Sequence, residues 1–463
     1  MKWSKYGKSF LVIFFSLIFK EVVAQQRHEF SVQQAIEFAS KNNIQVKNAL
    51  EEVKVQREIN REVTSLAYPQ FSGSISANHF PNVAIQTFPN FIAAATYGVL
   101  EEEGVKDGNG NPIVSPSDFG FIRAQFGTKF NTSYGVDFSW VLFDGQVFVG
   151  LLARDAVLDL AKKNVEVTEE QIKANIYKIY YQLVVGKKQL ESVDANIALL
   201  EKLLRDTKLL YENGFAEKLD IDKTSVSLTN LKTERTKLEN SLTIGNSGLK
   251  FLMGMPQQDV LILTDTLNDD EIKKDIAEAT YTYTDRKEFQ QIEIAEKLGE
   301  YNIKRYRLSR IPSLAAFGSY SRITQGNKLS FNKTFPSSVI GLKVTVPLFE
   351  GFAKEARYKK AFYELNQTKN SKEQLKQSID MEVEQARIKI RNAIITMDAQ
   401  KENQELAQKV YNTQKKKYEQ GLGSNLDIIN AQTELKTAQT NYFSAVYDAI
   451  IARIDYLKAT GKL

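Results

Sequence analysis

The chain has 463 residues, of which 61 are lysine or arginine and 56 are aspartate or glutamate, with no cysteine and only two histidines, His28 and His79. The lack of cysteine excludes disulfides, thiolate metal sites and a cysteine nucleophile. Charges of both signs are spread along the chain, which is typical of solvated helix faces and not of a nucleic-acid surface. Phosphate-binding, serine-hydrolase and zinc-protease motifs are absent from the sequence. We therefore expect no enzymatic activity, no cofactor, no metal and no nucleic-acid partner.

Residues 1–24 predict a cleavable export signal. Three lysines among the first eight residues precede an apolar run over residues 9–19. That run is too short to span a bilayer comfortably, and the small residues ending at Ala24 offer a cut before Gln25. An uncleaved anchor is the alternative. We expect an exported chain that begins at residue 25.

A helix over residues 31–66 is expected next, followed by two strands, 69–80 and 129–142, with a long loop at 81–127 between them. Along 129–142, apolar and aromatic residues alternate strictly with small or polar ones. Strands of ten or more residues with two such faces suit a membrane barrel around a watery lumen. A soluble sandwich, whose strands are usually shorter, is the alternative.

Residues 151–253 predict a long helical hairpin. Residues 151–212 contain no proline and would reach roughly 90–100 Å as one helix at 1.5 Å per residue. A sharp turn leads to a returning helix over 217–253. Apolar residues on both arms recur at alternating steps of three and four, which is the pattern of an antiparallel coiled coil.

The second half of the chain repeats the first. Residues 207–224 align with 414–431, so that Tyr, Glu, Gly, Leu, Asp and Ile recur in the same order. The segment 140–145 (WVLFDG) likewise matches 346–351 (VPLFEG) at nearly the same offset. Two separate motifs duplicated at one spacing indicate that a whole unit was duplicated.

This duplication divides the mature chain into a first repeat at 25–253, a connector at 254–284 with a short strand near 260–263, and a second repeat at 285–463. The second repeat opens on a helix and carries its own strand pair and helical hairpin. We place its strands at 312–322 and 338–349 and its hairpin at 354–461.

Four strands cannot close a barrel. An open sheet edge in hydrocarbon leaves unpaired backbone groups that each cost several kcal/mol. The smallest single-chain bacterial barrels have about eight strands. The chain is therefore expected to be an obligate oligomer, in which two copies would give eight strands and three would give twelve.

The export signal, the two strand pairs, the two hairpins and the duplicated turn motifs together resemble the TolC-like outer membrane efflux protein family over roughly residues 29–461. The resemblance implies an α+β membrane protein: a homotrimer whose shared 12-stranded β-barrel in the outer membrane lipid continues into a 12-helix α-barrel in the periplasm. It also implies a passive channel-tunnel for efflux or type I secretion. Its partners would be a periplasmic adaptor (membrane fusion) protein and, through it, an inner-membrane pump of the RND or ABC type.

The resemblance also implies a pore constriction just after the helical turns, where family members carry acidic residues in an L-D-x-x-D/N pattern. Asp427 matches the first position of this pattern and Asn430 the second. Asp220 is the first-repeat equivalent of Asp427, and Asp222 is an extra carboxylate. In an oligomer these carboxylates would attract cations. The alternative for Asp427 is a helix-capping box with Ser424.

The turns themselves are expected to dock the adaptor. Gly214, Gly421 and Gly423 would supply the positive φ that a tight turn between helices needs. Phe215 and Leu422 have no evident core to enter, so adaptor docking competes with local packing as their role.

Three other interpretations are open. A periplasmic coiled-coil adaptor, resembling membrane fusion proteins, usually offers one helical hairpin and a small β-domain. A trimeric surface adhesin would place its barrel strands together at the C-terminus, whereas this sequence ends in a predicted helix. An enzyme is disfavoured because no acid–base or nucleophile constellation is evident. The sequence does not name the cargo.

Overall fold

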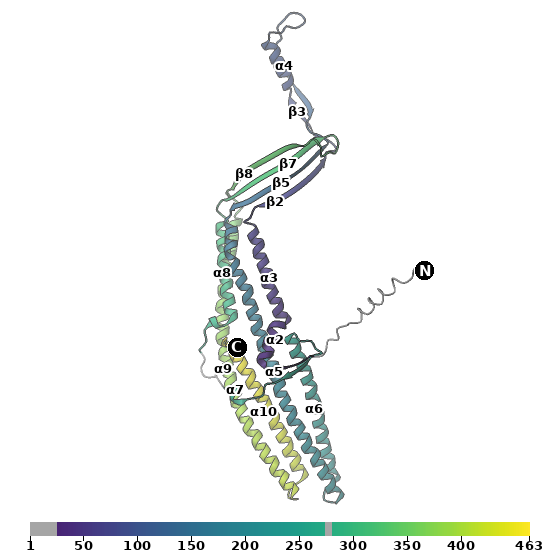
Figure 1. Ribbon diagram of the computed structural model, residues 1–463. Helices are drawn as coiled ribbons and strands as arrows, with labels where there is room; N and C mark the ends of the chain where they lie inside the picture. The colour runs from purple at the N-terminus through teal and green to yellow at the C-terminus, as the bar shows by residue number, and fades with distance from the viewer. Residues whose placement is uncertain (1–25, 274–279) are drawn as a thin grey trace, which may run out of the picture. The chain divides into compact units, whose positions relative to one another are not determined.

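The computed structural model describes residues 26–273 and 280–463 (Figure 1), so the expected signal at 1–24 lies outside the described residues. The chain forms two compact units. Of the described residues, one unit contains those up to Glu58 and those within Arg154–Glu300 and Phe362–Leu463; the other contains Ile59–Ala153 and Tyr301–Ala361. Each unit takes segments from both sequence repeats. The repeats and the compact units are therefore different divisions of the chain.

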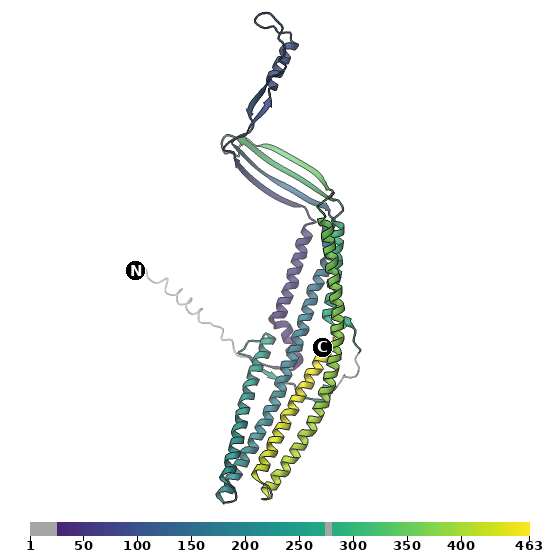
Figure 2. The same cartoon turned by 180° about the vertical axis from the view of Figure 1, so that it is seen from behind.

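The first unit is built on two antiparallel helical hairpins, which confirms the duplicated hairpin. Helix α5 spans Gly145–Glu212 and returns as α6, Lys218–Met253; helix α9 spans Ala353–Glu419 and returns as α10, Asn425–Ala459. Figures 1 and 2 both show α6 beside α5 and α10 beside α9. Leucines, isoleucines and alanines along these seams are buried. The buried set near the turns includes Leu200, Leu228, Leu231, Ile428 and Leu435.

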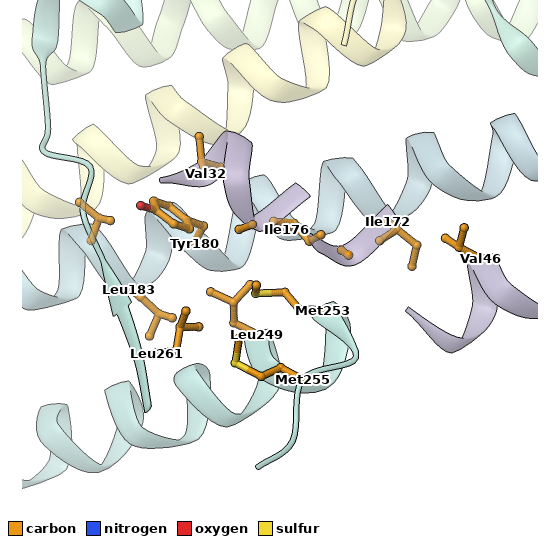
Figure 3. Close-up of a cluster of buried hydrophobic side chains, with 13 residues drawn as sticks. Val32, Val46, Ile172, Ile176, Tyr180, Leu183, Leu249, Met253, Met255 and Leu261 are labelled. Carbon is orange, nitrogen blue, oxygen red and sulfur yellow. The ribbon is translucent and has the colours of Figure 1, made fainter. Parts of the chain in front are cut away.

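A second buried cluster ties the start of the described chain to the first hairpin (Figure 3). Strand β1, Arg27–Phe30, pairs in parallel with β6, Val260–Leu263, which lies at the expected short strand of the connector. Tyr180, at 0% exposure, donates its hydroxyl to the Phe30 carbonyl at 2.8 Å and accepts from the Asp265 amide at 3.2 Å. One buried phenol thus bonds a backbone group at the last residue of β1 and another just beyond the end of β6.

The helix expected over 31–66 is wrong in one respect: it is two helices, α2 at Val32–Asn42 and α3 at Ile44–Ser65. Asn43 separates them with an extended ψ of 131°. Its side-chain oxygen accepts from the Gln45 and Val46 amides at 2.7 and 3.1 Å, which caps α3. Its Nδ2 donates to the Leu252 carbonyl at 2.6 Å, so the break is fixed by packing against α6.

Three further elements belong to the helical part of the chain. Helix α7 spans Asp269–Lys273 in the connector, and the 3₁₀ turn η1 at Tyr283–Asp285 leads into α8, Lys287–Leu308. Helix α8 opens the second repeat, as α2 and α3 open the first. Within the part of the chain that the structure describes, no helix has the combination of length and low polarity that a membrane crossing requires.

The second unit contains one four-stranded antiparallel sheet in the order β2-β5-β7-β8. The strands are β2 at Gln70–His79, β5 at Phe130–Phe143, β7 at Ser313–Gly326 and β8 at Phe335–Thr345. Each repeat supplies one neighbouring pair, and β5 pairs with β7 to join the repeats. The expected end of the last strand at 349 is wrong: β8 ends at Thr345, two residues before Pro347, which has no amide hydrogen to continue the ladder. The expected end of β7 at 322 is also wrong, because its ladder with β5 runs on to Gly326, opposite Phe130.

The sheet has two chemically different faces, which confirms the alternation. One row across the strands reads Phe71, Phe138, Gly318, Ile340, and the neighbouring row, on the other face, reads Ser72, Asp137, Ser319, Val339. Ile340 is 86% exposed in the single chain.

The segment 81–127, expected as a loop, is structured. Strands β3, Ile85–Pro89, and β4, Phe121–Gln125, form an antiparallel ribbon that carries helix α4, Phe91–Glu102, beyond the strands of the sheet (Figure 1). Asn90 caps the helix by accepting from the Ala93 amide at 3.0 Å.

Candidate functional site at the helical turns

The turns of the two hairpins have the same backbone geometry. Gly214 and Gly421 have φ of 78° and 72°, and each donates its amide to the carbonyl of the repeated tyrosine, Tyr211 or Tyr418, at 3.0 Å. The amide of the next residue, Phe215 or Leu422, donates to the carbonyl five residues back. These paired bonds close each helix in the manner of a Schellman motif. The duplicated sequence motif thus encodes a duplicated turn.

Gly423 does not have the positive φ that the sequence analysis assigned to it. A Cβ built there would lie 3.4 Å from the Tyr418 nitrogen, which is an ordinary contact. The turn therefore requires glycine at 421, where φ is positive, and not at 423.

Asp427 lies in the first turn of α10, where the capping box with Ser424 is present. Its Oδ2 accepts from the Ser424 hydroxyl at 2.8 Å and from the Ser424 amide at 3.2 Å, while the Ser424 hydroxyl accepts from the Asp427 amide at 3.2 Å. The hydrogen bond from the Ser424 hydroxyl, followed by that from its amide, lowers the pKa of Asp427 below its ordinary value. The carboxylate is therefore held charged and exposed at the turn.

Asp220 occupies the equivalent position of α6 and is half-buried. The Glu217 amide donates to its Oδ2 at 3.3 Å. Glu217 is not a Ser or Thr, so the reciprocal hydroxyl bond of the second repeat has no counterpart here. Asp222 and Asn430 are exposed on the first turns of α6 and α10. The structure brings all four predicted constriction residues to the turn end of the two hairpins.

A link between the hairpins was not foreseen from the sequence. Asn425 is 5% exposed, and its Nδ2 donates to the Asp220 carbonyl at 3.0 Å and to the Thr224 hydroxyl at 3.3 Å. Thr224 in turn donates to the same Asp220 carbonyl at 2.8 Å. At the offset of the repeat, Asn425 aligns with Lys218. In the sequence, this link could have been suspected only because Asn425 replaces the lysine of the first copy within an otherwise repeated motif.

The turns also present apolar side chains to solvent. Phe215 is 81% exposed and Leu422 is 76% exposed, and Leu219 and Leu426 are about half exposed. The alternative of local packing for Phe215 and Leu422 is wrong, because neither side chain enters a core of this chain. The turn end is thus a surface of mixed charge with exposed apolar side chains, supported by a buried seam.

Among residues 26–273 and 280–463, no group of three or more His, Asp or Glu side chains is placed to hold a metal ion. His28 Nε2 lies 3.6 Å from an Asp259 oxygen, and the ring of His79 stacks on Phe130 with centroids 4.5 Å apart. Both histidines have structural contacts.

Comparison with known proteins agrees with this architecture. Residues 283–462 match the profile of a family described as "Outer membrane efflux protein". The sequence is 21% identical over 336 residues to "Outer membrane protein TolC" of Vibrio cholerae, covering 72% of this chain and 77% of that one. It is 20% identical over 327 residues to "Alkaline protease secretion protein AprF" of Pseudomonas aeruginosa, covering 67% and 66% of the two chains.

Among solved structures, the fold matches that of CusC, described in connection with transmembrane channel formation, with a TM-score of 0.73 and 17% identity. The match covers 93% of this chain and 92% of CusC. At this identity the likeness concerns the fold, and it includes both hairpins and both strand pairs.

Proposed function

The chain belongs to the outer membrane efflux protein family, the TolC-like family, and from this premise we propose that three copies form a passive duct of a tripartite efflux or type I secretion system. In this proposal the sheets of three chains share a twelve-stranded barrel in the outer membrane, and the hairpins form a twelve-helix conduit in the periplasm. The chain reaches that membrane by the export signal at 1–24. It performs no chemistry, and a partner pump supplies the energy.

The observation that carries the proposal is the four-stranded sheet with two open edges. Strand β2 is exposed along all ten of its residues, and β8 is exposed at nearly every position. One face of the sheet is apolar and the other polar, as a wall between lipid and a water-filled lumen requires. In hydrocarbon the open edges would leave unpaired backbone groups, so β2 of one copy must pair with β8 of the next.

The helical turns support the second half of the proposal. Phe215 and Leu422 are large apolar side chains with no core on this chain. Exposed apolar residues on a repeated, glycine-fixed turn suit the docking of a periplasmic adaptor protein. Each of the three chains would place carboxylates at the mouth of the conduit, from Asp220, Asp222 and Asp427. Together these carboxylates would raise the local concentration of cations.

An adaptor-like role for the chain itself is the alternative. The sheet weighs against it, because two 14-residue strands, β5 and β7, lie at its centre with large apolar side chains exposed on one face. A periplasmic protein would leave that surface in water. The two hairpins, each following its own strand pair, also match the duct better than a single-hairpin adaptor.

Cysteine cross-linking tests the shared barrel directly, because the sequence contains no cysteine. In the S74C/S337C variant the two thiols lie on the same face of β2 and β8, at opposite edges of the sheet and about 14 Å apart across three strand spacings. A disulfide within one chain is therefore excluded by geometry. Because closing a barrel staggers its strands, we expect covalent dimers and trimers in detergent from S74C/S337C or from a pair stepped along the same two edges, whereas S74C alone gives no trimer.

If S74C/S337C and other pairs stepped along the same edges give only monomers, and native mass spectrometry also finds monomers, the shared barrel is wrong. Single-channel recording of the trimer in planar bilayers then tests the duct itself. A trimer that conducts no ions under any voltage would contradict the channel while leaving the assembly intact.

A further inference from the structure

Basic side chains gather within the second unit, at the last turns of α8 and the first turns of α9. Segments 304–310 and 346–360 hold eight lysines and arginines against two glutamates. We name these eight the basic collar; they are Lys304, Arg305, Arg307, Arg310, Lys354, Arg357, Lys359 and Lys360. The two segments meet at the end of the sheet where β7 begins and β8 ends.

Ion pairs account for part of the collar. Arg310 lies 2.6 Å from Glu355, and Lys354 lies 3.2 Å from Glu350. Lys304, Arg307 and Arg357 are exposed and form no ion pair within the part of the chain that the structure describes. The collar therefore carries an excess of positive charge that the folded chain does not neutralise.

Helix stability explains only some of these positions. Arg305 and Arg307 lie in the last turn of α8, where the helix dipole favours cations. Lys354 and Arg357 lie in the first turns of α9, where the dipole disfavours them. Lys354 is held there by Glu350 and by the Ser309 carbonyl, to which its Nζ donates at 2.8 Å. Arg357 has no ion pair among the described residues, so it is the cation at this end of α9 that an anionic ligand could compensate.

Exposed apolar side chains adjoin the collar. Leu348 is 92% exposed, Phe349 is 74% and Phe352 is 76%. These three line an open hollow of about 300 Å³ together with two ion pairs, Arg310–Glu355 and Lys354–Glu350. A neighbouring hollow of about 190 Å³ contains Arg357 and the end of α8. Cationic and apolar groups thus share one continuous surface.

Phe352 is held in an unfavourable backbone conformation. Its φ is 64°, in the left-handed region that asparagine or glycine adopts more readily than a bulky residue. The ring contributes little to the core because it is mostly exposed. The one ring contact of Phe352 recorded among the described residues is edge-to-face with Phe349, at 5.3 Å between centroids, and both rings are mostly exposed. Such strained positions often have a functional role.

We propose that this surface binds anionic glycerophospholipids, with the phosphate headgroup against Lys304, Arg307 and Arg357 and the acyl chains against Leu348, Phe349 and Phe352. This inference rests on the proposed function, because it assumes that the sheet lies in the outer membrane. The sheet end that joins the helices would lie at the periplasmic leaflet, where basic side chains meet headgroups while their stems and the aromatic rings stay in the apolar layer.

Native mass spectrometry of the detergent-solubilised full chain tests this with two probes, dioleoyl phosphatidylglycerol and dioleoyl phosphatidylcholine. We expect several-fold tighter retention of phosphatidylglycerol. Each basic side chain near an anionic surface contributes a factor of about five, so K304Q/R307Q/R357Q should weaken phosphatidylglycerol retention on the order of 100-fold. Phosphatidylcholine retention should change little.

The matched control is R205Q/K237Q/R391Q, which removes two arginines and one lysine that are exposed in the first unit and form no ion pair with the residues that the structure describes. It should retain phosphatidylglycerol like the native chain. F352N should reduce retention of both lipids without lowering the melting temperature, because asparagine tolerates the left-handed conformation. F251N, which truncates a phenylalanine that is 77% exposed on α6, should leave retention unchanged.

Equal retention of the two lipids by the native chain, or equal losses in the collar variant and its control, would overturn the inference. Competition by millimolar inorganic phosphate alone would also overturn it, since the site would then be a simple anion site. The same spectra count the chains in each assembly. A monomer that retains phosphatidylglycerol selectively would contradict the proposed trimer but not the lipid site. A trimer that retains both lipids equally would contradict the lipid site but not the trimer.

Discussion

The side chain of Asn425 in the second hairpin donates to the backbone carbonyl of Asp220 in the first, across 3.0 Å. This bond joins the start of α10 to the start of α6, the two positions where the sequence motif is duplicated. Because Asn425 is 5% exposed, water cannot readily replace the bond. The turn ends of the hairpins are therefore coupled, and a movement of one must break this contact or carry the other with it.

Replacing Asn425 by alanine should loosen this coupling. The change leaves the Thr224 hydroxyl and the Asp220 carbonyl with one partner fewer and should cost about 1–3 kcal/mol of local stability. We expect faster amide hydrogen exchange over residues 214–228 and 421–432 and little change in the sheet. N430A, which truncates an exposed asparagine five positions along the same helix, serves as the control. Equal exchange in both variants would show that the link carries no stability.

Two variants separate the capping role of Asp427 from a role in the pore. D427A removes both the charge and the cap, whereas S424A weakens the cap by about 1 kcal/mol but keeps the carboxylate. We expect D427A to raise single-channel conductance and weaken cation selectivity in planar bilayers, and S424A to leave both unchanged. Matching effects of the two variants would assign the whole result to capping. No effect of either would remove Asp427 from the constriction.

The start of α10 should also respond to acid. Hydrogen bonds from Ser424 lower the pKa of Asp427 in the folded chain. A lowered pKa means that this carboxylate stabilises the fold above its ordinary pKa, and that the contribution disappears as pH falls through the lowered value. Hydrogen exchange at residues 424–430 should therefore rise below about pH 4 after correction for the intrinsic rate. S424A should shift that rise to higher pH, and an unshifted rise would contradict the assignment.

Tyr180 offers a test of the cluster that anchors the first strand. Y180F keeps the ring but deprives the Asp265 amide of its acceptor at 3.2 Å and removes one of two donors to the Phe30 carbonyl, which keeps the Thr264 amide at 3.1 Å. Unsatisfied buried backbone groups cost about 1–3 kcal/mol. We expect a lower melting temperature in detergent and earlier proteolysis near β1 and β6. Y363F, at a tyrosine that is 60% exposed on α9, should leave both unchanged.

The periodic parts of this fold could be predicted from the sequence, and the parts set by single side chains could not. The alternation of apolar and polar residues along 129–142 predicted both ends of β5 to within one residue. This pattern is reliable because a one-residue shift would move every apolar side chain to the other face of the sheet. The break at Asn43 was missed because the apolar period continues through it, although asparagine there is a common cap signal. The segment 81–127 gave no periodic signal long enough to distinguish the ribbon and α4 from a loop.

The same limit applies to the turn site. The glycines, the carboxylates and the exposed Phe215 follow from local turn chemistry, which a duplicated motif makes visible. The partner of Asn425 lies on another hairpin, 205 residues away along the chain. No local pattern encodes a contact at that separation, and only the departure from the repeat at this position pointed to a special role.

Two glycines with the same backbone conformation should respond very differently to alanine. Gly254 and Gly421 have φ of 71° and 72°. A Cβ on Gly254 would lie 2.3 Å from the Asn42 carbonyl oxygen and 2.6 Å from its carbon, whereas a Cβ on Gly421 meets nothing within 4 Å. G421A should therefore cost only the left-handed penalty of about 1 kcal/mol. G254A adds a clash with backbone that cannot rotate away, and it should cost about 3 kcal/mol or more. Guanidinium unfolding in detergent compares the two, and similar midpoints would show that α2 can move away from the end of α6.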